Sequence, residues 1–490
     1  MNNHIIHTFL HPKSVAVIGA SKNLVKGGYR IVTNLIVNKF KGKVYLVNPN
    51  ADGELYKLKF YKTVLDIEDD VEIAIFYVPN QTIPGLLREC IQKGIKGAII
   101  EASGFEEVGD KGMELKRQIL DITDNFSRIR IVGPNCMGLS TIDEDSTSEQ
   151  KSGFFSGFGV FSKYKRGNIA IISQSGMLNG GYLSHQIEQH PELGIRYSCS
   201  VGNKMDLGEI EFLEYLIEDP TVNVIAIYLE SFKNPRKFIE LCKKAKKLPN
   251  KTIILVKGGL TSLGQKATLS HTGSLAEDRN LVNAIIKQSA IIQANTFYEL
   301  FQYAQTFSMM YNSRKKLPSN GKVAFVAGSG GAGTITADLT MNYGLQFPEF
   351  DPQTYPFLVE VFPDWMPPNH FAFVDIWPAM EKAMMSGIRP AVIMKKVYNA
   401  LINDSQIEGI FNMMFCSSQF RAMNDIEGIA KFFQSTEKPI FYWLIGEAKE
   451  VARMSNILAK YDIPNFPNLE DMVKNLKILV IEAKNKEKND

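Results

Sequence analysis

Residues 14–28 read SVAVIGASKNLVKGG, and this stretch sets the pattern for the whole chain. Five small or β-branched residues predict a buried strand, and the glycine that follows begins a turn into a helix. The same pattern returns at 168–181, NIAIISQSGMLNGG, and at 322–333, KVAFVAGSGGAG. Because strands that alternate with helices build parallel sheets, the sequence predicts an α/β protein with three similar blocks in series.

Further short apolar runs bounded by glycine or proline assign strands to each block. They lie at 43–49, 72–79, 97–104 and 129–135, then at 197–203, 224–230 and 252–259, and in the third block at 439–446. We predict a Rossmann-like domain over 1–143 and two further α/β domains over 167–312 and 321–490. The stretch 143–166 lacks periodicity, and 312–321 is polar, so both are interpreted as linkers.

The composition indicates a folded protein, because 45% of the 490 residues are hydrophobic and 22% are charged. The net charge is only +3 and the lysines are scattered, so a nucleic-acid partner is not expected. Five widely separated cysteines form no metal or disulfide pattern. No signal peptide or apolar run of membrane-spanning length is found, so we expect a soluble cytoplasmic protein.

The turn after the first strand is the first candidate site. Its backbone N–H groups at a helix start can approach a phosphate, and its lysines supply positive charge. A purely structural turn is the alternative, because a strict GxGxxG is absent. Open α/β sheets bind ligands where their strands end, so the other strand ends should line the same crevice. The candidates for a nucleotide-containing ligand are Gly19, Ala20, Ser21, Lys22, Lys26, Val78, Pro79, Ser103, Gly104, Asn135 and Cys136.

The second candidate site is the turn that begins the second block. Its residues Ser173, Gln174, Ser175 and Gly176 follow a strand, open a helix and offer hydroxyl and N–H groups to an anion. A serine nucleophile is the rival interpretation. The turn lacks the G-x-S-x-G pattern of a hydrolase, so phosphate binding is favoured.

The third candidate is His271, which lies in ATLSHTGSLAED among small hydroxylated residues. Thr272, Gly273 and Ser274 leave an imidazole accessible and supply donors for an oxyanion. Glu230 ends a predicted strand, where its carboxylate could hold one ring nitrogen and leave the other nucleophilic. A surface or structural histidine, and a solvated strand end for Glu230, are the alternatives.

Together these motifs resemble the α subunits of ADP-forming acetyl-CoA and other acyl-CoA synthetases, which are relatives of succinyl-CoA synthetase. The resemblance covers all three blocks and follows the family's order through HPKSVAVIGAS, KVYLVNP, YVP, GFEEVG, GPNCMGL, GNIAIISQSG, SVGNKMD, YLES and SHTGSLA. It implies a first domain that binds CoA and two flavodoxin-like domains. It also implies that His271 is transiently phosphorylated, that Glu230 steadies it, and that residues 173–176 cradle the phosphate.

The implied reaction converts a carboxylate, CoA and ATP into acyl-CoA, ADP and phosphate through acyl phosphate and phosphohistidine. The three blocks use the whole chain and leave no room for an ATP-grasp domain. A separate ATP-grasp β subunit is therefore expected, in an α2β2 heterotetramer, with ATP or ADP and Mg²⁺ bound at that partner. No metal ligands are assigned to this chain.

Two departures from the family pattern stand out. Glu277 replaces the glycine that commonly follows SHTGSLA, and with Asp278 it is expected to add negative charge near the phosphoryl site. Ala372 and Phe373 replace an Asn-Pro pair in the third block. A CoA-binding regulatory protein that has lost phosphoryl transfer is one alternative, and the retained His271 argues against it. A nicotinamide oxidoreductase is another, and the missing GxGxxG with its acidic ribose ligand argues against that.

Overall fold

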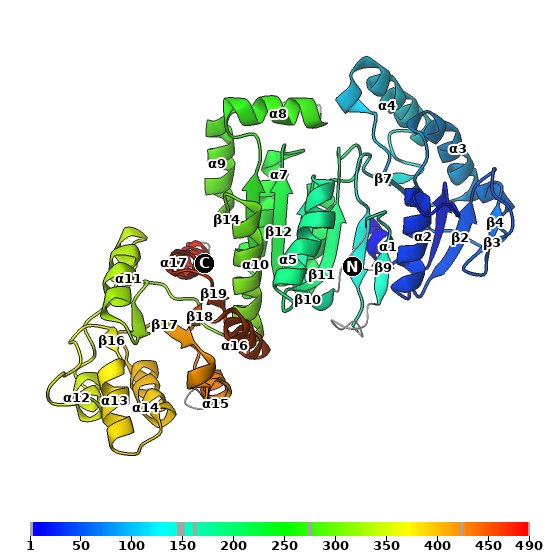
Figure 1. The fold of residues 1–490 in the computed structure, drawn as a ribbon. Helices are drawn as coiled ribbons and strands as arrows, with labels where there is room; N and C mark the ends of the chain where they lie inside the picture. The colour runs from blue at the N-terminus through cyan, green and yellow to red at the C-terminus, as the bar shows by residue number, and fades with distance from the viewer. Residues whose placement is uncertain (1–2, 145–151, 160–163, 273–276, 422–424, 489–490) are drawn as a thin grey trace. The chain divides into compact units, whose positions relative to one another are not determined.

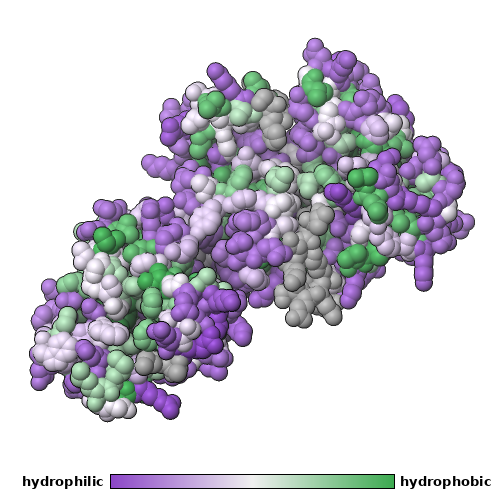
Figure 2. All heavy atoms as spheres, in the orientation of Figure 1, coloured by the Kyte–Doolittle hydropathy of each residue, from purple (hydrophilic) through white to green (hydrophobic). Residues whose placement is uncertain are grey.

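The computed structural model describes residues 3–144, 152–159, 164–272, 277–421 and 425–488, without the side chains of residues 270–272. Its contacts divide the chain into two compact units, Met1–Ala304 and Gln305–Asp490. The first unit holds two mainly parallel sheets and the second holds one, which confirms the α/β class (Figure 1). In the view of Figure 2, polar side chains cover most of the surface. No described helix is long and apolar enough to cross a membrane.

The first sheet is parallel except at one edge, where β3 and β4 pair in opposite directions. Its order is β3 (Glu54–Leu55), β4 (Leu58–Tyr61), β2 (Lys43–Val47), β1 (Ser14–Ile18), β5 (Ile73–Phe76), β6 (Gly97–Ile100), β7 (Arg130–Val132). The chain leaves β1 toward β2 and later returns to β5 on the other side, which opens a crevice at the strand ends beside β1. The helices of this domain are α1 (Ile5–Leu10), α2 (Gly27–Val37), α3 (Ile83–Lys93) and α4 (Asp110–Thr123).

The second sheet has a flavodoxin-like parallel core, whose spatial order is 2-1-3-4-5. The strands run β11 (Gly194–Ser200), β10 (Lys165–Ser173), β12 (Val224–Leu229), β13 (Thr252–Lys257), β14 (Ile292–Gln293). A π-helical segment at Leu178–Tyr182 leads into α5. The helices are α5 (Leu183–Gln189), α6 (Glu209–Glu218), α7 (Pro235–Lys246), α8 (Ser262–Thr272), α9 (Arg279–Ser289) and α10 (Phe297–Asn312).

Two antiparallel strands, β8 (Leu139–Ile142) and β9 (Gly153–Phe155), extend the second sheet beyond β11. The prediction of a linker over 143–166 is wrong in part, because this stretch contains β9. The sequence does not reveal this strand, since its three residues, GFF, are too few to show a periodicity among serines and glycines. The chain therefore enters the second sheet with β8, just before the predicted linker.

Buried side chains of both sheets form one continuous core in the first unit. The apolar cluster includes Val17 and Leu46 from the first sheet and Ile172 and Ile225 from the second. Full burial of such a side chain stabilises the folded state by about 1.5–3 kcal/mol. The shared core fixes the strand ends of the first sheet relative to those of the second.

The second unit repeats the 2-1-3-4-5 order in an all-parallel sheet. Its strands run β16 (Phe373–Asp375), β15 (Val323–Ala327), β17 (Gly409–Cys416), β18 (Ile440–Gly446), β19 (Asn465–Phe466). The helices are α11 (Gly330–Asn342), α12 (Thr354–Val361), α13 (Trp377–Met385), α14 (Pro390–Asn403), α15 (Ile426–Phe432), α16 (Ala448–Lys460) and α17 (Leu469–Glu487). This confirms the flavodoxin-like character expected of the third block.

The division between the units falls inside α10, before the polar stretch 312–321. The second half of this helix belongs to the second unit, where the Thr306 hydroxyl donates to Asn475 Oδ1 at 2.7 Å in α17. Ala372 and Phe373 replace the family's Asn-Pro; Ala372 is fully buried just before β16, and Phe373 is the first residue of that strand. A side chain at Gly333 would lie 2.1 Å from the Phe373 ring, so the ring packs against the backbone of α11.

Candidate active site

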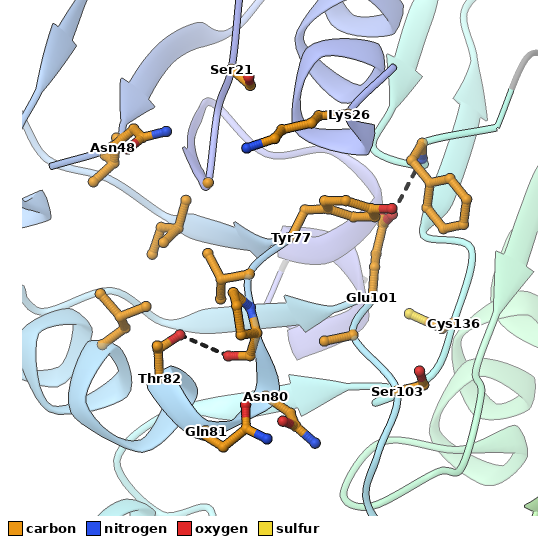
Figure 3. A pocket seen from close by; sticks show the side chains of 18 of the residues that line it. Ser21, Lys26, Asn48, Tyr77, Asn80, Gln81, Thr82, Glu101, Ser103 and Cys136 are labelled. Atoms are coloured by element: carbon orange, nitrogen blue, oxygen red, sulfur yellow. Dashed lines mark hydrogen bonds between the residues drawn. The ribbon is translucent and has the colours of Figure 1, made fainter. Parts of the chain in front are cut away.

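A cavity of about 1410 Å³ lies in the first unit where the strands of the first sheet end (Figure 3). Residues after β1, β2, β5, β6 and β7 line it, and the turn after β10 of the second sheet completes its wall. Ten of the residues predicted from the sequence belong to this lining: Gly19, Ser21, Lys26, Val78, Pro79, Ser103, Asn135, Cys136, Gln174 and Gly176. The structure thus brings two of the three candidate sites to one cavity.

Two glycines let the first turn lie close to its neighbours. Gly19 has a φ of +91°, and a Cβ there would lie 2.2 Å from the Tyr77 carbonyl oxygen. A Cβ at Gly28, in the first turn of α2, would lie 2.0 Å from the Gly19 carbonyl oxygen. Only glycine fits both contacts, and they hold the start of α2 against the end of β1. Lys26 precedes this helix and its ammonium group points into the cavity (Figure 3).

Three predicted residues of the first domain are not part of the cavity lining. Ala20 is fully buried, and the Lys22 ammonium lies 5.8 Å from the centre of the Phe60 ring. The Gly104 N–H donates to Glu107 Oε1 at 2.7 Å, which ties it to its own loop. Their proximity in sequence to lining residues made them candidates, but the side of the turn on which each lies depends on the tertiary fold.

Several lining residues were not predicted, namely Asn48, Tyr77, Asn80, Gln81, Thr82 and Glu101. All of them lie at or just after the ends of strands that the sequence did identify. Asn48 Nδ2 donates to the Ala20 carbonyl at 2.7 Å and braces the first turn. The polar run at 80–82 directly follows Val78 and Pro79, so the sequence itself indicates further polar side chains at this strand end.

Glu101, at the end of β6, is the most unusual polar group of the cavity. Its side chain is only 5% exposed. One carboxyl oxygen accepts from the Phe158 N–H at 3.2 Å, while Oε1 has no hydrogen-bond partner among the described residues. Burial raises the pKa of Glu101 well above its ordinary value. Burial thus favours the neutral form of this carboxyl group, which lines the cavity.

Cys136 lies in the wall beside Glu101 (Figure 3). Its thiol donates to the Ile100 carbonyl oxygen at 3.3 Å, and burial raises its pKa. A thiol held in this way is not a nucleophile. The five cysteines of the chain are all free and buried.

The turn after β10 is held mainly by its own side chains. The Ser173 hydroxyl accepts from the Ser175 N–H and lies 3.0 Å from the Ser175 carbonyl oxygen, to which it donates. Because Ser173 is fully buried and engaged in this way, a serine-hydrolase role is excluded for it. Gln174 Oε1 accepts from the N–H groups of Glu230 and Ser231, at 2.6 and 3.0 Å. Its Nε2 is buried and has no partner among the described residues, although Gln174 lines the cavity.

Glu230 follows β12 and is 4% exposed, so the alternative of a solvated strand end is wrong. The Tyr228 hydroxyl donates to Glu230 Oε1 at 3.2 Å. The Glu230 carbonyl oxygen accepts from Lys257 Nζ at 2.7 Å. These contacts fix a buried carboxyl group at the ends of β12 and β13.

His271 and Thr272 end helix α8, but their side chains lie outside the described residues, as do Gly273 and Ser274 entirely. Helix α8 lies against the 3₁₀ turn at Glu106–Val108, which follows β6. The backbone of the His271 helix is thus placed beside the first domain (Figure 1). The pairing of His271 with Glu230 stays a prediction.

Glu277 and Asp278 differ from the expectation of added negative charge. Asp278 caps α9 by accepting from the Asn280 N–H at 2.8 Å. The Glu277 carboxylate is paired with Lys257 Nζ at 3.1 Å and accepts from the Phe232 N–H at 2.6 Å. The charge of Glu277 is therefore compensated by a buried ammonium group, which the sequence pattern does not reveal.

Comparisons with known families agree with this architecture. Residues 13–141 match a family described as CoA binding domain, and residues 166–307 match a succinyl-CoA ligase like flavodoxin domain. The first range contains all seven strands of the first sheet, and the second contains the parallel core of the second sheet from Arg166 onward.

Among curated proteins, acetate–CoA ligase (ADP-forming) II of Archaeoglobus fulgidus is 35% identical over 96% of this chain and 65% of its own length. The acetate–CoA ligase (ADP-forming) I subunit alpha of Pyrococcus furiosus is 32% identical over 99% of this chain and all of its own length. The chain spans about half to two thirds of the first curated relatives that it matches.

Among solved structures, a dinucleotide-forming acetyl-coenzyme A synthetase 1 of Ca. Korarchaeum cryptofilum, in complex with phosphate and ADP, superimposes with a TM-score of 0.83. It is 28% identical, and the match covers 99% of this chain and 98% of that one.

Proposed function

Because this chain belongs to the family of ADP-forming acyl-CoA ligases, we propose that it is the CoA-binding, phosphohistidine-carrying subunit of such a ligase. One observation carries the proposal: a single cavity joins the strand ends of a CoA-binding domain to the turn at 173–176 of the second sheet. A chain with these two features can bring a thioester and a phosphate together.

The chemistry proceeds in two steps on this chain. Phosphate attacks the acyl carbon of acyl-CoA, so that the C–S bond breaks, CoA leaves as the thiol and acyl phosphate forms. The neutral imidazole of His271 then attacks phosphorus; a P–N bond forms, the acyl P–O bond breaks and the carboxylate leaves. The phosphoryl group passes from His271 to ADP, and the reverse sequence makes acyl-CoA from ATP.

The residues around the cavity fit a CoA molecule. Lys26 offers positive charge to phosphate groups, together with the N–H groups of the turn that begins at Gly19. Ser21 and Asn48 add neutral polar groups. In the neutral form that burial favours, the Glu101 carboxyl group can donate a hydrogen bond, and the amide carbonyls of the pantetheine arm accept such bonds.

The turn at 173–176 fits a phosphoryl group. Gln174 Nε2 is a buried donor without a partner among the described residues, and a phosphoryl oxygen would satisfy it. The side-chain oxygen of Gln174 also holds the loop of Glu230. Glu230 in turn is proposed to orient the His271 ring, so that the outer nitrogen carries the lone pair. Thr272, Gly273 and Ser274 are proposed to add donors.

A partner completes the enzyme. We assign ATP or ADP, with Mg²⁺, to a separate ATP-grasp subunit, and we propose an α2β2 assembly in the cytoplasm. The naming of the P. furiosus relative as subunit alpha supports a second chain. Without that partner, the purified chain should form no acyl-CoA from ATP.

Labelling with phosphate tests the proposal whichever carboxylic acid the enzyme uses. The full chain, co-purified with its ATP-grasp subunit, is incubated with Mg²⁺ and ATP labelled at the γ-phosphate. An acid-labile, base-stable label on this chain is expected, and calorimetry should detect CoA but no NADH binding. CoA binding without label would favour a regulatory protein, and NADH binding without CoA binding would refute the assignment.

A further inference from the structure

The loop that follows β12 is fixed by an uncommon set of hydrogen bonds. Four successive backbone N–H groups donate to side-chain oxygens from three different parts of the second domain. Glu230 and Ser231 donate to Gln174 at 2.6 and 3.0 Å, Phe232 to Glu277 at 2.6 Å and Lys233 to Glu209 at 2.5 Å. Glu230 therefore belongs to a loop whose backbone has little freedom to move.

Lys257, the last residue of β13, connects this loop to Glu277. Its side chain is fully buried. Nζ donates to the carbonyl oxygens of Glu230 and Gly258, each at 2.7 Å, and forms the ion pair with Glu277 at 3.1 Å. The ammonium group thus has two carbonyl acceptors and one carboxylate beside it, and Glu277 supplies its only ion pair among the described residues.

The charge of Glu277 is needed to hold this arrangement. Its side chain is 14% exposed, so the ion pair with Lys257 is largely shielded from water. A buried ammonium group whose negative partner is removed becomes strongly destabilised and moves toward water or loses its proton. Either response would change the contact of Lys257 with the Glu230 carbonyl oxygen.

Glu277 is also tied to the helix that carries His271. Its carbonyl oxygen accepts from Gln265 Nε2 at 3.3 Å, and Gln265 lies in α8. The same residue therefore contacts the helix of the predicted nucleophile and the loop of the carboxylate predicted to orient it. A shift of Glu277 would move both elements relative to each other.

We propose that Glu277 is a positioning residue for phosphoryl transfer, which fixes the Glu230 loop and helix α8 in one geometry through Lys257, the Phe232 N–H and Gln265. The inference rests on the proposed function, because it deepens the account of the histidine step. It assigns a role to the residue at which this chain departs from its family's usual glycine.

The test separates the charge of Glu277 from its hydrogen bond. Glu277→Gln keeps an oxygen for the Phe232 N–H and removes the charge opposite Lys257. We expect His271 to be phosphorylated about 10- to 100-fold more slowly from γ-labelled ATP, because small misplacements of reacting groups cost rates of this size. The Kd for CoA, measured by calorimetry, should stay within about twofold of wild type, because Glu277 does not line the cavity.

Glu277→Asp retains the charge, so its phosphorylation rate should lie between those of Glu277→Gln and wild type. A residue that acted only through packing would show no such dependence on charge. The matched control is Asp219→Asn, at a residue that precedes β12 and so lies toward the opposite end of that strand from Glu230. Asp219 is 3% exposed and accepts from the Thr221 N–H at 2.8 Å. Its loss should lower the thermal midpoint without slowing the phosphorylation of His271.

Two failures can be told apart. If wild type acquires no label, the proposed function is wrong. If wild type is labelled and a folded Glu277→Gln or Glu277→Asp protein acquires label at the wild-type rate, the positioning role alone is wrong. An equal slowing in Asp219→Asn would also overturn it, since the effect would then follow stability. Should Glu277→Gln fail to fold, Glu277→Asp decides the question.

Discussion

The second and third sheets share the strand order 2-1-3-4-5, yet their strand ends differ in chemistry. After the strands of the second sheet, Gln174, Glu230 and Lys257 are all at most 5% exposed and form one connected network. After the strands of the third sheet, the Ser417 hydroxyl donates to the exposed Glu447 at 2.7 Å, and Glu450, which is 3% exposed, pairs with Arg421 and Arg453. The same topology thus ends in a network that reaches the cavity through Gln174 in the second sheet, and in two arginine–carboxylate pairs in the third.

The largest expected effect concerns His271, the nucleophile proposed for the second domain. His271→Ala removes the nucleophile, so both the phosphoprotein label and acyl-CoA synthesis from ATP should vanish. Exchange of phosphate into acyl phosphate from acyl-CoA should survive, because it precedes the histidine step. Incubation with γ-labelled ATP, Mg²⁺ and the partner subunit measures the label. A label that persists in His271→Ala would place the phosphorylated residue elsewhere in the chain.

The second prediction compares Gln174 with Asn412, a buried amide in the third sheet. Gln174→Leu leaves the Glu230 and Ser231 N–H groups unsatisfied, at about 1–3 kcal/mol each, and removes the donor proposed for the phosphoryl group. We expect phosphorylation of His271 to slow at least about 10-fold. Asn412→Leu in β17 removes an amide that is 1% exposed and donates to the Phe441 carbonyl. It should lower stability without that kinetic loss, and equal slowing in both variants would contradict the contrast.

Acid should affect the two units differently, since six of the seven histidines lie in the first unit. His11 Nε2 lies 3.0 Å from the Tyr197 hydroxyl, and burial lowers the pKa of His11 to about 4. The folded state therefore favours the neutral ring, and stability is lost as the pH falls from the unfolded pKa of about 6.5 toward 4. The full loss is up to about 3 kcal/mol.

Thermal unfolding between pH 7 and 4, followed by hydrogen exchange in each unit, measures this effect. His11→Gln should reduce the loss of stability of the first unit toward acid and leave the pH dependence of the second unit unchanged. A pH dependence that is identical in wild type and His11→Gln would show that the ring is protonated as readily in the folded protein as in the unfolded chain.

The smallest expected effect lies in the third domain. The Ser329 hydroxyl accepts from the Ala332 N–H at 3.3 Å and caps α11. Ser329→Ala should lower the free energy of unfolding of the second unit by about 1 kcal/mol, measured by denaturant titration. Ser173→Ala, in the corresponding turn of the second sheet, should cost more because its hydroxyl is fully buried. The reverse order would show that the two turns do not differ as described.

Much of this molecule follows from its sequence. The repeated strand, glycine and helix pattern predicts the α/β class, and the positions of strand ends predict much of the cavity lining. Residues such as Asn80 and Glu101 were missed although they lie at or just after the ends of recognised strands. Several polar residues occur at each strand end, and the tertiary packing determines which of them line the cavity. The role of Gln174 as a holder of the Glu230 loop depends on the alignment of β10 with β12.

The pairing of Glu277 with Lys257 is the clearest limit of sequence reasoning. The two residues are separated by the whole of α8, and an acidic residue beside a phosphate turn suggests repulsion. In the fold, the end of β13 lies close to the start of α9, so that Glu277 forms an ion pair with Lys257. Similarly, β9 is too short to carry a periodic signal and exists because β8 offers it a partner.

Glu101 also makes the folding of the first unit a proton-uptake reaction. Burial raises the pKa of this carboxyl group in the folded state, so the folded state holds the proton more tightly than the unfolded chain does. The contribution of Glu101 to stability therefore falls as the pH rises, by up to about 1.4 kcal/mol per pH unit between the unfolded and folded pKa values, which is opposite in sign to the contribution of His11. A ligand carbonyl that accepts a hydrogen bond from this carboxyl group would strengthen its hold on the proton, so heats of binding would vary with the ionisation enthalpy of the buffer, and Glu101→Gln would abolish that variation.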